Sequence, residues 1–341
     1  MLLEGIFLPL TTPFRPEGRL YLPKLEYNVD RYSRTPAAGM HILGANGEAD
    51  GLTDHEACEV LGTAIAAAAK EKVMIAGVGR ESVFATLALV EAAAAAGYDA
   101  VSLGGPAFAQ DGGMRLEVVT YFQAVADRSP LPVVLVSRDG RELGTELIGE
   151  LAGHPQVIGV IDDSDRVGEI GAVTTGVSRE VEVTTVFAAA TGRMSRKGAS
   201  GDFVSAASLG GGTALTVAAG PAIKTRRKKV GFQVLAGKTA GMLGAWENGA
   251  VGAVPRLGAA APQACCEVFQ AWKDQDPELA RVKQERVLEV AGRMEGFGGV
   301  AWSKYGADWN GYFGGRVRLP LLGLTGEKRG ELEEMLGGMR N

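Results

Sequence analysis

Val157-Ile-Gly-Val-Ile-Asp-Asp-Ser164 carries the clearest structural signal in the sequence. An apolar run of strand length that ends abruptly at two aspartates and a serine is typical of a buried strand followed by a turn. On both sides of this segment, a short apolar strand is repeatedly followed by an alanine- and leucine-rich helix. Repeated βα units imply a parallel sheet whose chemistry lies at the carboxyl ends of the strands. We therefore predict that position 161 lies in the interior or in the wall of a βα barrel.

Eight such strands can be counted along the chain, and six βα units precede any irregularity. The predicted fold is α/β, a (β/α)8 TIM barrel with a C-terminal helical appendage. We expect the barrel in residues 1–270, with an insertion at about 173–229, and a helical region in residues 271–341. The predicted strands span residues 5–14, 40–43, 73–79, 100–103, 132–136, 157–161, 232–236 and 250–254. The predicted helices span residues 23–33, 53–70, 82–96, 116–127, 145–152, 239–247, 263–273 and 279–294, followed by further helix to residue 341 with a Gly- and aromatic-rich joint at residues 309–315.

The insertion differs in composition from the rest of the chain. Residues 180–187 alternate like a strand, Gly-, Ser- and Ala-rich stretches follow, and a basic cluster occupies Lys224-Thr-Arg-Arg-Lys-Lys229. A segment this long without clear periodicity is typical of an added strand or hairpin with a long loop. The basic cluster favours a solvated face, with anion binding as the alternative.

Composition narrows the classes of partner. The 341 residues carry a formal charge of −5 and a pI near 5.5, which argues against a nucleic-acid binder because such proteins need a surplus of Lys and Arg. No window is apolar for long enough to span a membrane, and the N-terminus lacks the basic region of a signal peptide. The expected partners are a small anionic molecule and other subunits, with no nucleic acid and no membrane, in the cytoplasm.

Cysteine and histidine usage indicates no metal or redox chemistry. The three cysteines have no CxxC spacing, and the adjacent Cys265 and Cys266 fall in a helical stretch, so ordinary packing is the expected role. The histidines are scattered and form no evident zinc or His/Asp pattern: His41, His55 and His154. We expect no cofactor.

An ordered set of motifs spans residues 5–260. It comprises Leu10-Thr-Thr-Pro-Phe14, Leu43-Gly-Ala-Asn-Gly-Glu48, Leu52-Thr-Asp-His-Glu56, Ile75-Ala-Gly-Val-Gly79, Gly97-Tyr-Asp-Ala100, the segment 157–164 and Val234-Leu-Ala-Gly237. In this order the motifs resemble the dihydrodipicolinate synthase / N-acetylneuraminate lyase family, the pyruvate-type class I aldolases. The resemblance implies a TIM barrel that commonly assembles into dimers or tetramers, so we expect a homo-oligomer.

The resemblance also implies a mechanism, and the chain departs from it. In the family, a lysine on the sixth strand forms an imine with pyruvate, and a tyrosine relays protons. By resemblance, Ile161 occupies the lysine position and Val136 the tyrosine position. Ala45 replaces the first threonine of the family's Gly-Thr-Thr-Gly-Glu turn, and Phe108 stands where the family has a tyrosine. Losing the nucleophile alone abolishes covalent catalysis, because the remaining groups act through it.

Several residues are still suited to binding an anion. Arg141 lies close to where the family places an arginine for the substrate carboxylate, and Arg256 leaves the eighth strand; both can clamp a carboxylate or phosphate. An ordinary surface arginine is the alternative for Arg141. The side chain of Asn46 and the backbone amides near Ala45 can also hold an anion. Binding is therefore expected to outlast catalysis.

Two residual routes to catalysis stay open. Lys238 follows the seventh strand and is the lysine best placed to replace the missing nucleophile, provided that a dry environment lowers its pKa. Alternatively, Asp162, Asp163, Asp165 and Glu48 offer oxygen ligands for Mg²⁺ or Mn²⁺. Asp162 matches an aspartate that is common in the family without a metal role, which favours a structural function for it.

Three hypotheses follow. The first is a family member that has lost Schiff-base aldolase/lyase chemistry and binds a small anionic, keto-acid-like ligand in the barrel mouth. The second is a carbon–carbon lyase of altered mechanism that uses Lys238 or a metal. The third is a non-catalytic subunit that assembles with an active relative. Whether the chain is an enzyme at all is left open by the sequence.

Overall fold

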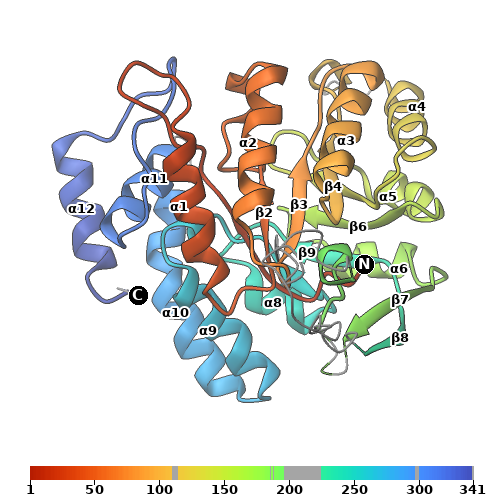
Figure 1. The fold of residues 1–341 in the computed structure, drawn as a ribbon. Helices are drawn as coiled ribbons and strands as arrows, with labels where there is room; N and C mark the ends of the chain where they lie inside the picture. The colour runs from red at the N-terminus through yellow and green to blue at the C-terminus, as the bar shows by residue number, and fades with distance from the viewer. Residues whose placement is uncertain (110–113, 185, 187, 196–223, 296–298, 340–341) are drawn as a thin grey trace, which may run out of the picture.

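The computed structural model describes residues 1–109, 114–184, 186, 188–195, 224–295 and 299–339. Within these ranges, eight parallel strands close into a barrel in the order β1-β10-β9-β6-β5-β4-β3-β2 (Figure 1), which confirms the predicted TIM barrel. The barrel strands are β1 (Gly5–Pro9), β2 (Gly39–Ile42), β3 (Val73–Gly77), β4 (Ala100–Gly104), β5 (Val133–Ser137), β6 (Val157–Asp162), β9 (Gln233–Ala236) and β10 (Gly252–Ala253).

Helices between the strands cover the outside of the barrel (Figure 1). They are α1 (Leu22–Ser33), α2 (Asp54–Ala67), α3 (Val83–Ala96), α4 (Arg115–Ala126), α5 (Thr145–Ala152), α6 (Val167–Val173) and α8 (Met242–Glu247). The predicted capping box is present in α2, where the Thr53 side chain accepts from the Glu56 amide and the Glu56 side chain accepts from the Thr53 amide. This reciprocal capping fixes where α2 begins.

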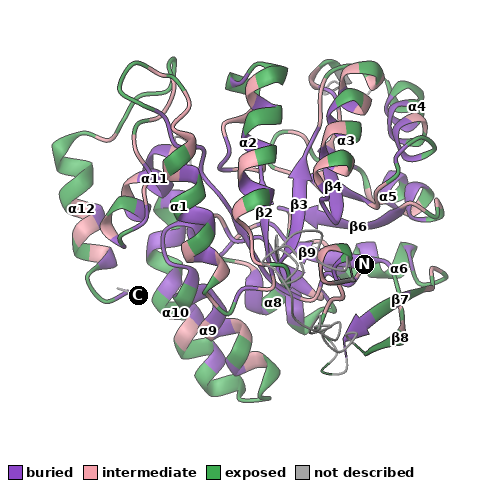
Figure 2. Ribbon diagram, viewed as in Figure 1, coloured by how far each residue is buried: buried purple, intermediate pink, exposed green. Residues whose placement is uncertain are grey.

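The strands are buried on both faces, as Figure 2 shows for the centre of the molecule. One apolar cluster fills the barrel interior: Leu3, Phe7, Val73, Ile75, Ala100, Val134, Ile158, Ile161, Leu235 and Val254. β6 approaches β9 so closely that a Cβ on Gly159 would lie 2.3 Å from the Gln233 carbonyl oxygen. A glycine is therefore required there, and the register it permits pairs Ile161 with Leu235. Ile161 faces the barrel interior.

The first strand is shorter than predicted. It ends at Pro9 rather than Phe14, and the following segment belongs to the mouth of the barrel. Pro13 has no N–H to continue a ladder, and the Thr12 side chain turns to donate to the Gly47 carbonyl at 2.7 Å. Phe14 pairs only through an isolated bridge with Leu20.

The described part of the insertion lies at the amino end of the barrel, away from the mouth. β7 (Arg179–Thr184) and β8 (Thr225–Val230) form a separate antiparallel pair, and a short helix, α7 (Gly192–Ser195), follows β7 in sequence. Lys228 pairs with Glu4, just before β1, and the Arg179 guanidinium donates to carbonyls in the turn before β6. The basic cluster falls on β8 and is largely exposed. Residues 196–223 of the insertion lie outside the described residues.

The C-terminal region packs along one side of the barrel and reaches its mouth. Its helices are α9 (Pro262–Lys273), α10 (Pro277–Met294), α11 (Gly299–Trp309) and α12 (Gly326–Leu336). The segment 310–325 is not helical, so the break begins at the predicted joint of residues 309–315 and extends ten residues further than predicted. It lies against α1, where Tyr312 stacks on Tyr32 and the Phe313 amide donates to Asn28. The division into residues 1–270 and 271–341 stays a prediction, since α9 crosses this boundary.

Over the described part of the chain, none of the helices combines the length and apolar content that a membrane span requires.

Candidate functional site

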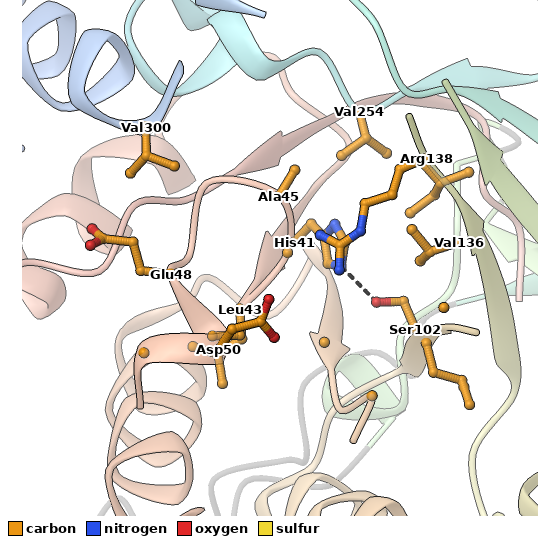
Figure 3. Close-up of a pocket in the computed structure, with 18 of the residues that line it drawn as sticks. His41, Leu43, Ala45, Glu48, Asp50, Ser102, Val136, Arg138, Val254 and Val300 are labelled. Carbon is orange, nitrogen blue, oxygen red and sulfur yellow. Dashed lines mark hydrogen bonds between the residues drawn. The ribbon is translucent and has the colours of Figure 1, made fainter. Parts of the chain in front are cut away.

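A cavity of about 420 Å³ opens at the carboxyl ends of the barrel strands. Its wall is formed by loops that follow β2, β3, β4 and β5, and its roof by the C-terminal region. Figure 3 shows His41, Ser102 and Arg138 converging in this cavity, with Val136 and Val254 beside them. This is the position at which TIM barrels carry their functional sites.

The floor of the cavity is apolar. Ile161 and Val254 belong to the barrel-interior cluster, and Val136 packs against that cluster; all three line the cavity. β5 and β6 place Val136 and Ile161 side by side, because the two residues are register partners. No amine or hydroxyl projects from positions 136 and 161 into the cavity.

Arg138 is the cation of the cavity that has no directly paired anion in the described part of the chain. It follows β5, is half-buried and lines the cavity. Within the described residues, its guanidinium makes no hydrogen bond and no ion pair. Burial lowers the pKa of Arg138, and the more distant Asp50 carboxylate opposes that effect. A guanidinium stays charged in proteins, so the cavity holds a positive charge with no directly paired anion among the described residues, although the Asp50 carboxylate lines the same cavity.

His41 and Ser102 form a buried polar pair below Arg138. They come from β2 and β4, are 3% and 2% exposed, and bring His41 Nε2 to 2.6 Å from Ser102 Oγ. Burial and then the charge of Arg138 lower the pKa of His41 to about 4. The imidazole is therefore neutral at neutral pH.

Arg318 and its neighbours hold the roof. Its guanidinium donates to both Glu56 carboxylate oxygens at 2.9 and 2.7 Å, and to the carbonyls of Gly18 and Gly51. The Arg318 amide donates to Glu48 at 2.8 Å. Glu48 also pairs with Lys304 at 2.5 Å, and these two side chains are 3% and 1% exposed. The apolar roof residues are Val300, Leu319, Pro320 and Leu321.

The turn after β2 forms part of the cavity wall, but one of its two predicted binding residues is engaged elsewhere. Ala45 lines the cavity, as expected. The side chain of Asn46 is buried and donates to the carbonyls of Pro9 and Arg256. Asn46 therefore joins two mouth loops, and its amide nitrogen is already engaged.

The two arginines predicted for anion binding differ from Arg138. Arg256 pairs with Asp163 at 2.9 Å and does not line the cavity. Arg141 lines two shallower depressions beside the cavity, one of which also includes Arg138. Phe108 is half exposed and does not line the cavity. Of the predicted catalytic and anion-binding residues, Ala45, Val136 and Ile161 therefore line the cavity, and the others do not.

Lys238 lies beside the cavity in an ionic environment. Its ammonium pairs with Asp139 at 2.8 Å, and this hydrogen bond raises the pKa of Lys238 against the smaller effect of burial. An imine-forming amine has to lose its proton, so a raised pKa opposes that reaction.

Three of the four carboxylates considered as metal ligands, all except Asp165, pair with a cation. Asp162 pairs with Arg166, Asp163 with Arg256, and Glu48 with Lys304. Across the described ranges, no group of three or more His, Cys, Asp or Glu could hold a metal ion. The cysteines are unpaired thiols, and burial raises the pKa of Cys266 to about 12.

Sequence reasoning missed Arg138, Ser102 and the role of His41. One signal was available: His41 and Ser102 interrupt apolar strands, and a polar residue inside a barrel strand usually has a partner. Their pairing across β3 could not be read from the sequence. The sequence pattern indicated Arg141 as the anion-binding residue, whereas the structure places Arg138, three residues earlier, in the cavity.

Comparison with known proteins identifies the family. A model of the dihydrodipicolinate synthetase family matches residues 2–216. The chain belongs to this family. Among curated family relatives, a 4-hydroxy-tetrahydrodipicolinate synthase of Xanthomonas axonopodis pv. citri is 34% identical over 163 residues, which cover 47% of this chain and 53% of the enzyme. The chain thus spans about half the length of that relative. A synthase of Cereibacter sphaeroides is 26% identical over 337 residues, 97% of each chain.

Solved structures of dihydrodipicolinate synthetase-family proteins share the fold. YagE, a prophage protein of E. coli K12 solved in complex with pyruvate, superposes with a TM-score of 0.78, 21% identity and 99% coverage of each chain. At this identity the likeness concerns the fold alone. Because the match covers 99% of each chain, the C-terminal helices are part of the shared fold.

Proposed function

We propose that this dihydrodipicolinate synthetase-family protein has lost Schiff-base aldolase/lyase chemistry and binds a small keto-acid-like anion in the barrel mouth. The observation that carries the proposal is the half-buried guanidinium of Arg138, which has no paired anion among the described residues and lies above a floor that contains Ile161. A cation in such a place is stabilised by an anionic ligand, because a carboxylate matches the guanidinium in charge and geometry.

The size and lining of the cavity support a small ligand. About 420 Å³ accommodates a molecule of a few carbon atoms, and Val136, Val254 and Ile161 offer apolar contact for its alkyl part. Ala45 adds the turn after β2 to the wall. The proposed primary anchor is Arg138, in place of Arg141 and Arg256, with Arg141 as a second contact for ligands that extend outward.

Calorimetric titration with pyruvate, combined with borohydride trapping, tests the proposal. We expect saturable binding by the untreated protein and no mass increase after reduction with borohydride in the presence of pyruvate. An active synthase labelled in parallel provides the positive control. Absence of pyruvate binding would remove the support for a keto-acid ligand.

The same trapping experiment addresses the second hypothesis, a carbon–carbon lyase that uses Lys238. A reduced adduct that maps to Lys238 by peptide analysis would establish that the nucleophile has moved. The pairing of Lys238 with Asp139 makes this the less favoured outcome. A metal-dependent lyase is disfavoured in the same way, because Asp162, Asp163 and Glu48 each have a cationic partner.

The third hypothesis, a non-catalytic subunit, depends on assembly. Homo-oligomerisation and pairing with an active relative both stay predictions. Light scattering of the purified chain, followed by co-expression with an active family member and affinity purification, distinguishes a homo-oligomer from a mixed one.

A further inference from the structure

Anion binding by Arg138 leaves the buried pair of His41 and Ser102 without a role. Two polar side chains on β2 and β4 meet in the interior of an apolar barrel at 2.6 Å. Burying polar groups costs free energy unless their hydrogen bonds are satisfied. Both residues line the same cavity as Arg138, and Figure 3 shows all three side chains pointing toward one another. A ligand held by Arg138 is therefore within reach of the pair.

The hydrogen-bond balance of His41 determines which proton is available to a ligand. Within the described residues, His41 Nδ1 is buried and has no partner. A buried N–H without an acceptor is rarer in proteins than an unused lone pair, so we place the single imidazole proton on Nε2. Nε2 then donates to Ser102 Oγ. No other acceptor for the Ser102 hydroxyl hydrogen is found in the described chain, so that hydrogen is available to the cavity.

Gly44 leaves room for the imidazole in this position. A Cβ at residue 44 would lie 2.4 Å from His41 Nδ1 and 2.5 Å from Cε1, over the face of the ring. Any other residue at position 44 would therefore displace the imidazole, so the placement of the ring beside Ser102 requires this glycine.

We propose that Ser102, oriented by His41, donates its hydroxyl hydrogen to the C2 carbonyl oxygen of a 2-oxo carboxylate whose carboxylate group binds Arg138. This inference rests on the proposed function and adds a specificity-determining residue, Ser102, and a positioning residue, His41. The alkyl end of the ligand packs on Val136 and Ile161. No bond is made or broken in this recognition step, which requires only that the ligand present two acceptor groups next to an apolar end.

Matched ligands test the inference. Calorimetry with 2-oxobutyrate and butyrate, which differ only at C2, measures the contribution of the carbonyl oxygen. We expect the wild-type protein to prefer 2-oxobutyrate by roughly five- to tenfold, the usual effect of one net hydrogen bond. Ser102→Ala should reduce this preference to about onefold, because it weakens binding of 2-oxobutyrate and leaves butyrate affinity unchanged.

Ser129→Ala is the matched control. Ser129 is also buried and donates one side-chain hydrogen bond, to the Leu131 carbonyl, at the amino end of β5. It should keep the full preference. Equal affinities for 2-oxobutyrate and butyrate in the wild-type protein would overturn the inference while leaving anion binding intact. If neither ligand binds, the proposed function fails and the inference fails with it.

A second readout does not depend on the stability of a variant. Nitrogen-15 NMR of the wild-type protein reports which nitrogen of His41 carries the proton. We expect the Nε2–H tautomer, with an Nε2 resonance that shifts when 2-oxobutyrate is added and shifts less with butyrate. A proton on Nδ1 would mean that Ser102 donates to His41 rather than to the ligand, and this result would overturn the inference.

Discussion

Arg138 and Arg318 line the same cavity but differ in their hydrogen bonds and ion pairs. Arg318 is bound by Glu56 and by two carbonyls, whereas Arg138 has no hydrogen-bond or ion-pair partner in the described chain. Glu56 raises the pKa of Arg318, while burial lowers that of Arg138. Arg318 thus holds the roof onto the barrel, whereas Arg138 is the residue that we propose binds the ligand.

The roof has a second fixed charge in Lys304. Its ammonium is buried, pairs with Glu48 and donates to the Arg316 carbonyl. Burial lowers the pKa of Lys304, and the Glu48 carboxylate opposes that shift. The roof therefore depends on charges that pair with one another. The loss of stability on breaking such a pair can be compared with the effect of removing Arg138, which has no direct partner among the described residues.

The largest effect is expected from Lys304→Met. This change leaves Glu48 buried without its cation, and breaking such a pair costs roughly 3–5 kcal/mol of unfolding free energy. Urea denaturation with an unchanged m-value measures this cost. The double variant Lys304→Met with Glu48→Gln should recover part of the loss, because it removes the stranded charge. A cost below about 1 kcal/mol for the single variant would contradict the buried pair.

The next effect is a loss of stability on acidification caused by His41. Its folded pKa of about 4 lies below the unfolded value of 6.5, so the unfolded state takes up the proton first. Stability is complete above pH 6.5 and falls as the pH drops to 4, by roughly 3 kcal/mol. In His41→Leu, the free energy of unfolding measured over the same pH range should not show this decrease. If the variant and the wild type lose the same stability between pH 6.5 and 4, the decrease is caused by other groups.

A smaller effect is expected from Arg318→Met, which frees Glu56 and loosens the roof. The Glu56 carboxylate is partly exposed, so the cost should be roughly 2 kcal/mol, near the lower end for hydrogen bonds to charged groups. The Arg318 guanidinium lowers the pKa of Glu56 from 4.5 to about 2, so the wild type loses stability as the pH falls through this range. The variant should lose less stability there, as acid titration monitored by circular dichroism can measure.

The smallest effect on stability is expected from Arg138→Met. Among the described residues no hydrogen bond or ion pair is lost, and a partly buried charge without a direct partner is removed, so the free energy of unfolding should not fall by more than about 0.5 kcal/mol. Arg318→Met is the matched comparison, since it removes the other arginine of the cavity. If Arg138→Met is as destabilising as Arg318→Met, the distinction between the two residues does not hold.

Much of the fold was predictable from local patterns. The run from Val157 to Ile161 is apolar because β6 is buried on both faces, and the capping box at Thr53 marked the start of α2. The sequence left position 161 in either the interior or the wall of the barrel, and the structure places it in the interior. These features depend on neighbours in the sequence, where hydrophobic periodicity and capping chemistry act.

The details of the site depend on contacts that sequence patterns do not contain. Arg138 and Arg141 both follow β5, and their backbones pair across a turn that has Gly140 at φ 76°. That turn decides which guanidinium enters the cavity. The roof is set by Arg318 meeting Glu56, more than 260 residues earlier in the chain, and no local signal indicates such a partner.

The most direct test of the account is the affinity for pyruvate of Arg138→Met relative to wild type, measured by calorimetry with Arg141→Met as the control. The account predicts that Arg138→Met binds at least roughly tenfold more weakly, the loss expected for a hydrogen-bonded charge, while Arg141→Met stays within about threefold of wild type. Equal pyruvate affinity in wild type and Arg138→Met would contradict the assignment of Arg138 as the anion anchor.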